Sequence, residues 1–131
     1  MKLFFKSKDG GKESTVTGYF LIESKSFFSI VLLKFEGKSR EAYHTHAFNC
    51  LSWVLKGNLI ERFRRNNYYI RTYSAKLIPF KTYKHDYHKV DSIGTSWVLS
   101  FRGKWDKEWM EYTKEAGDYT LTNGRIKKTY E

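Results

Sequence analysis

Short stretches of alternating apolar and polar residues follow one another along the chain, and polar turns separate them about every 8–12 residues. Successive side chains of a strand point to opposite faces, so this alternation predicts strands with one buried face. We count about ten such stretches and find no long helix, no repeat and no linker. The pattern therefore predicts a single all-β, mostly antiparallel domain over residues 1–131, built as a sandwich or a small barrel.

The predicted strands cover residues 16–23, 27–35, 41–46, 48–55, 59–64, 68–73, 76–83, 87–90, 95–101 and 119–122. Residues 27–33 are nearly all apolar and are a good candidate for a buried strand. Lys56-Gly57-Asn58 predicts a tight turn after which 59–64 returns as the partner strand of 48–55. In the strand at 48–55, Trp53 should share one face with Leu55, and Ser52 should share the other with Val54.

The C-terminal third contains the least and the most regular local patterns of the chain. Residues 105–114 are ambiguous and are compatible with one helical piece. Asn123-Gly124 between alternating residues is the preferred sequence of a type I′ hairpin turn. Ten Tyr, ten Phe and four Trp against a single Pro also favour strands, because aromatic side chains suit pleated, half-buried surfaces.

Charge and cysteine content narrow the choice of partners and compartment. The formal net charge is +10, which suits either a lysine-rich soluble surface or attraction to nucleic acid, nucleotides or other anions. Cys50 is the only cysteine, so an internal disulfide is excluded. The apolar run at residues 3–5 is too short for a signal peptide, and no run approaches membrane-spanning length. We expect a soluble, cytoplasmic protein.

Two histidines, His44 and His46, are one residue apart in a predicted strand. Side chains two apart on a strand point to the same face, about 7 Å apart along it. Two imidazoles on one face form half of a metal site. His88 is the preferred third ligand, with His85 as a reserve or as a group behind the ligands. Three imidazoles suit zinc, iron(II), manganese, nickel or copper, and the sequence does not choose among them.

Four segments containing these histidines resemble a known family. They read H-T-H-A-F-N-C-L-S-W-V-L-K-G-N-L-I-E, then Y-H-K-V, W-V-L-S-F-R-G and E-W-M-E. They are similar to the two-motif pattern of the cupin superfamily, and more narrowly to small bacterial and phage cupin-like proteins. The matched positions are His44, His46, Phe48, Ser52, Leu55, Gly57, Glu61, His88, Val90, Trp97, Leu99, Gly103, Glu108 and Trp109.

The departures from the family pattern concern the metal site. The common first motif has a glutamate four or five residues after the second histidine, where this chain has Cys50 and Leu51. Ala47 replaces a proline, and Asn58 replaces a second glycine. The site is then formed by three histidines alone, recruits Glu61 from the neighbouring strand, or is lost.

The resemblance implies a cupin-like jelly-roll barrel with a divalent metal in its mouth, held by His44, His46 and His88. It also implies oxygenation, isomerisation or hydrolysis of a small, anionic molecule, with Glu61 as a candidate catalytic base. Five further side chains are candidates for substrate binding at the barrel mouth or in the pocket wall: Arg62, Arg71, Trp53, Trp97 and His85.

Two other functions remain open from the sequence. The first is a non-catalytic protein that binds a nucleotide or another anion in its pocket, as a phage-encoded protein acting in the host cytoplasm would do. The second is nucleic-acid binding through the arginine-rich strand. Cupin-like barrels often pair through strand edges, which would give a homodimer.

Overall fold

The computed structural model describes residues 1–9, 14–38, 43–64, 68–84, 86–113, 117–122 and 126–129. Within these ranges the chain forms thirteen strands and no helix. The strands are β1 (Lys2–Lys8), β2 (Val16–Glu23), β3 (Ser29–Glu36), β4 (Tyr43–His44), β5 (Cys50–Lys56), β6 (Asn58–Arg64), β7 (Tyr68–Ser74), β8 (Phe80–Thr82), β9 (His88–Ser92), β10 (Thr95–Arg102), β11 (Glu108–Thr113), β12 (Gly117–Thr122) and β13 (Ile126–Thr129). No helix in the described part of the chain is long and apolar enough to cross a membrane.

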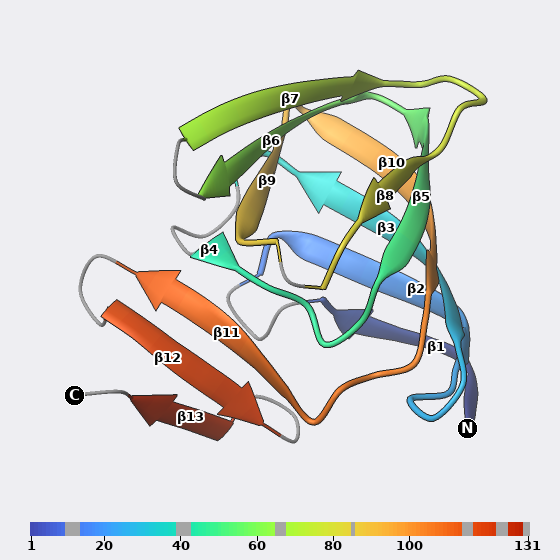
Figure 1. The fold of residues 1–131 in the computed structure, drawn as a ribbon. Coiled ribbons are helices and arrows are strands. Elements are labelled where there is room, and N and C mark those ends of the chain that lie inside the picture. Colours follow the sequence, from blue (N-terminus) through green and yellow to red (C-terminus); the bar gives the residue numbers. More distant parts are fainter. Residues whose placement is uncertain are drawn as a thin grey trace.

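The strands form two antiparallel sheets that face each other (Figure 1). The first sheet has the order β1-β2-β3-β10-β5-β8, and the second has the order β13-β12-β11-β4-β9-β6-β7. Apolar side chains from both sheets meet between them in one cluster: Phe20, Val31, Leu33, Val54, Leu59 and Val98. The all-β, antiparallel architecture predicted from the alternating pattern is confirmed, and it is that of a jelly roll.

The first sheet buries small polar side chains beside this core. Ser52 on β5 and Ser96 and Ser100 on β10 are each at most 4% exposed, and they alternate with outward-facing neighbours. Ser52 Oγ donates to Ser100 Oγ at 3.0 Å, so these buried hydroxyls are paired. Because serine is small, one part of the space between the sheets is left unfilled by side chains.

The prediction that 59–64 pairs with 48–55 is wrong. β5 has β10 and β8 as its neighbours, and β6 crosses to the second sheet, where it pairs with β7 and β9. Gly57 is the single residue between β5 and β6, and its φ of +92° is a conformation that side-chain-bearing residues rarely adopt. The chain therefore turns the corner of the barrel at Gly57 instead of folding back as a hairpin.

Two other segments differ from the sequence-based expectation, and a third is tested only in part. Residues 108–113 form strand β11, because they pair with β4 on one side and β12 on the other, so the helical alternative for 105–114 is wrong. β3 begins at Ser29, and Phe27 lies before it with 76% of its surface exposed. β12 and β13 pair as a hairpin, with Thr122 opposite Ile126, but the Asn123-Gly124 turn lies outside the described residues.

Gly57 allows a direct test of the corner. A Cβ at this position would lie 2.7 Å from the Thr95 carbonyl oxygen and would also meet Ser96 Oγ. Gly37 has a φ of +67°, but a Cβ added there would meet nothing within 4 Å, so it is a matched control for backbone strain alone. Gly57→Ala should lower the free energy of unfolding by about 2 kcal/mol more than Gly37→Ala, because a clash in a packed region adds to the strain. Urea denaturation measures both; equal losses would mean that the corner adapts to a methyl group.

Candidate metal centre

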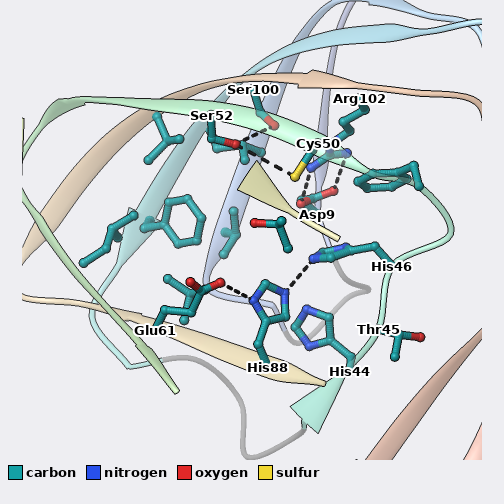
Figure 2. Close-up of a pocket in the computed structure, with 18 of the residues that line it drawn as sticks. Asp9, His44, Thr45, His46, Cys50, Ser52, Glu61, His88, Ser100 and Arg102 are labelled. Atoms are coloured by element: carbon teal, nitrogen blue, oxygen red, sulfur yellow. Dashed lines mark hydrogen bonds and ion pairs between the residues drawn. The ribbon is translucent and has the colours of Figure 1, made fainter. Parts of the chain in front are cut away.

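Three histidines come together at the inner side of the second sheet. His44 on β4 lies directly opposite His88 on β9, and His46 follows β4 two residues later. The ring centroids are 5.0 Å apart for His44 and His46, 4.9 Å for His44 and His88, and 4.8 Å for His46 and His88. One nitrogen of each ring lies within 4.8 Å of the others, so the three side chains can form a metal site (Figure 2).

The backbone around Thr45 holds His46 in this position. β4 ends at His44, so the strand geometry that was expected to orient both histidines does not extend to His46. Instead, the amide of Thr45 donates to the Met110 carbonyl at 2.8 Å, and the Met110 amide donates to Thr45 Oγ1 at 2.8 Å. The amide of His46 donates to the Lys84 carbonyl at 3.2 Å. These bonds hold Thr45 and His46 between β11 and the residues that precede β9.

Glu61 lies behind His88 with only 1% of its surface exposed. His88 Nδ1 is 2.5 Å from Glu61 Oε2, and the Tyr73 hydroxyl donates to Glu61 Oε1 at 2.6 Å. Burial and the neighbouring Glu61 raise the pKa of Tyr73, which keeps its hydroxyl protonated as a donor. With Nδ1 directed to the carboxylate, Nε2 of His88 is the nitrogen that faces His46, at 2.7 Å.

His46 is held in the neutral form that can act as a ligand. Burial, followed by the charges of His88, His44 and Arg102, holds the pKa of His46 well below its usual value. A neutral imidazole has a free lone pair, which a metal ion or a hydrogen-bond donor can use. The 2.7 Å contact between His46 and His88 is such a hydrogen bond, with one ring donating and the other accepting.

The histidines line a cavity of about 170 Å³ between the sheets. Glu61 and Tyr73 line it on the second sheet, and Ser52 and Ser100 line it on the first. Trp105 and Trp109 also border the cavity, as do Arg102 and Asp9, which form an ion pair. Figure 2 shows this ion pair and the histidines around the same pocket.

Arg102 and Asp9 are functional candidates that the sequence pattern does not identify. The predicted strand at 95–101 ends at Phe101, which leaves Arg102 in a turn. β10 includes Arg102, and the buried alternation Ser96, Val98, Ser100 continues to it. Extending the period of two by one residue would have identified Arg102 as an inward-facing charge.

Four of the predicted substrate-binding residues do not line this cavity. Trp53 packs against Phe101, with ring centroids 5.5 Å apart, on the face of β5 opposite to the buried Ser52. Trp97 contacts Tyr19, at 5.8 Å between centroids, on the corresponding face of β10.

The two predicted arginines lie elsewhere on the second sheet. Arg62 forms an ion pair with Asp91, and Arg71 is exposed with its guanidinium 5.3 Å from the centre of the Phe63 ring. The fifth residue, His85, lies outside the described residues.

Comparison with known proteins gives information on the fold. No protein-family model matches the chain, and a search of curated proteins finds no match. Among solved structures, a cupin superfamily protein from Desulfitobacterium hafniense is similar over 73% of this chain and 84% of that chain, with a TM-score of 0.55 and 16% identity. An RmlC-like cupin from Shewanella frigidimarina is similar over 73% and 80%, with a TM-score of 0.56 and 16% identity.

The hydroxypropylphosphonic acid epoxidase from S. wedmorenis is also similar, with a TM-score of 0.56 and 12% identity over 67% of this chain. A structure of iron(II) HppE has a TM-score of 0.62 and 13% identity over 76% of this chain. The chain spans only about half the length of these two proteins, 50% and 55% respectively. The resemblance inferred from the histidine motifs is thus confirmed at the level of architecture: the chain has the cupin fold.

Proposed function

We propose that this protein binds a divalent metal ion through His44, His46 and His88 and acts on a small molecule in the adjoining cavity. The observation that supports this most directly is the convergence of three imidazoles on one cavity, with a buried carboxylate behind one of them. A carboxylate behind a ligating histidine is the usual arrangement in metal sites. A bound divalent ion would supply a Lewis acid and, if it is redox-active, a centre for oxygenation.

Glu61 supports the site by positioning His88. Its two oxygens accept hydrogen bonds from His88 and Tyr73, on the edge of the His88 ring that faces away from His46. Since one oxygen orients the imidazole and the other is held by a tyrosine, we assign Glu61 the role of a positioning residue. This role differs from the direct ligand and the general base that were predicted from the sequence.

The cavity favours a small ligand with negative charge. Its volume of about 170 Å³ is below the range of about 300–1,000 Å³ that is typical of sites for drug-sized molecules. A nucleotide would not be enclosed in it. Arg102 places a guanidinium in the wall, and a similar fold carries the hydroxypropylphosphonic acid epoxidase, which is named for an acidic small molecule. We therefore favour a small anionic substrate, bound beside Arg102, over an enclosed nucleotide.

Metal content tests the proposal. The protein, purified without a histidine tag, should contain close to one divalent metal ion per chain by elemental mass spectrometry, and His46→Ala should lose it. His85→Ala is the matched control, since it removes the one histidine outside the proposed triad, and it should retain the metal. A parent protein that takes up no iron, manganese, nickel, copper or zinc after reconstitution would exclude the proposed function.

The role of Glu61 gives a second prediction. Glu61→Gln keeps the size of the side chain but removes the charge that holds His88, so metal affinity should fall about 10- to 100-fold. Tyr73→Phe should weaken the affinity less, because the carboxylate remains. Glu36→Gln, which changes an exposed surface glutamate paired with Lys34, is the control and should have no effect. Competition with a fluorescent chelator measures the affinities. Unchanged affinity in Glu61→Gln together with lost turnover would instead support the general-base role.

A further inference from the structure

A buried arginine forms part of the cavity wall on the first sheet. Arg102, at the end of β10, has only 4% of its surface exposed. Its Nη1 and Nη2 donate to the two carboxylate oxygens of Asp9 at 3.1 and 2.7 Å. Asp9 follows β1, which is separated from β10 by two strands of the same sheet. The cavity therefore contains a guanidinium fork that is already engaged by a planar carboxylate.

Two buried donors near this pair lack an acceptor among the described residues. They are Arg102 Nε and Trp105 Nε1. Both residues line the cavity that contains the histidines. Buried donors in native proteins almost always have a partner, and one without a partner in the protein is often completed by a ligand or by water. These two atoms therefore indicate that this part of the wall is suited to an additional acceptor.

Phe48 connects the two donors to each other and to the histidines. The guanidinium carbon of Arg102 lies 4.7 Å from the centre of the Phe48 ring, and the Trp105 ring lies 5.2 Å from it between centroids. The centre of the Phe48 ring is also 5.0 Å from the centre of the His46 ring. Because Arg102 and His46 contact the same ring, a ligand held by Arg102 would lie close to the proposed metal site.

The two members of the ion pair differ in their access to solvent. The side chain of Asp9 is 27% exposed, whereas that of Arg102 is 4% exposed. Asp9 can therefore gain hydration when it leaves the fork, but Arg102 would remain a buried cation that needs an anion. Exchange of one carboxylate for another is the change that keeps the buried charge compensated.

We propose that Arg102, together with Trp105 Nε1, anchors the carboxylate group of the small substrate, and that Asp9 is an internal carboxylate that the ligand displaces. This inference rests on the proposed function for the identity of the site, and it adds the substrate class, a small carboxylic acid. The end-on geometry of the fork on Asp9 supports a planar carboxylate in particular.

Acetate binding to the metal-free protein is the test. Acetate should raise the midpoint of thermal unfolding of the parent protein, relative to chloride at the same ionic strength. Asp9→Ala removes the internal competitor, so its midpoint should be lower without acetate, and its affinity for acetate should be at least about tenfold higher. Arg102→Lys keeps the positive charge but not the fork, so the acetate-specific shift should be lost. Asp91→Ala, which breaks the ion pair with Arg62 outside the cavity, is the matched control and should respond like the parent.

The outcomes separate the anchor from the metal site. Equal acetate responses in Asp9→Ala, Asp91→Ala and Arg102→Lys would mean that the Arg102–Asp9 pair only ties β1 to β10, and would overturn the proposal. A response found only in metal-loaded protein would place the anion on the metal and would also overturn it. A tighter response to inorganic phosphate than to acetate would overturn the carboxylate assignment. Metal content is measured on the same samples, so that the two proposals can fail separately. If Arg102→Lys loses the acetate response but retains the metal, the proposed metal site stands. If acetate binds to a protein that takes up no metal, the anchor stands and the metal site does not.

Discussion

The burial of the Glu61 carboxylate is the constraint on which the site depends. A carboxylate that is 1% exposed is strongly destabilising unless donors surround it, and here His88 and Tyr73 supply them from the two strands that flank β6. A shift of one residue in either strand pairing would turn one of these donors to the outer face and leave the charge uncompensated. On the other side of β9, the pairing with β4 places His88 opposite His44, so the strand that compensates Glu61 also joins the histidines.

Gly57 allows β6, which follows β5 directly, to lie in the second sheet. If the chain folded back there as a hairpin, Glu61 would lie beside β5 in the first sheet, away from His88. The positive φ at Gly57 carries the chain around the corner instead, and the Asn58 amide then donates to Ser96 Oγ at 3.0 Å. A single backbone conformation thus decides which sheet receives the carboxylate.

The sequence predicted the architecture and the three histidines, because both depend on local periodicity and on a recognisable motif. It did not predict how Glu61 is used, since a period of two gives the face of a strand but not the neighbour across the sheet. It also placed Trp53 and Trp97 in the candidate site. Side chains an odd number of residues apart on a strand point to opposite faces. Because Ser52 and Ser100 are buried, Trp53 and Trp97 therefore lie on the outer face. Arg102 was not predicted because the predicted strand ended one residue too early. An arginine directly after a strand was therefore assigned to a turn, whereas it is the last, inward-facing residue of β10.

The two sheets make chemically different contributions to the cavity. The second sheet and the residues after β4 supply imidazoles and a compensated carboxylate, while the first sheet and the end of β1 supply an arginine, small serines and an aspartate. The serines leave the space, because larger residues at positions 52 and 100 would fill it. A polar ligand in this space would meet imidazole nitrogens on one side and guanidinium donors on the other. Since Arg102 and His46 both contact the ring of Phe48, a molecule that reaches both of them must be short, and this limit on length follows from the packing of the cavity wall.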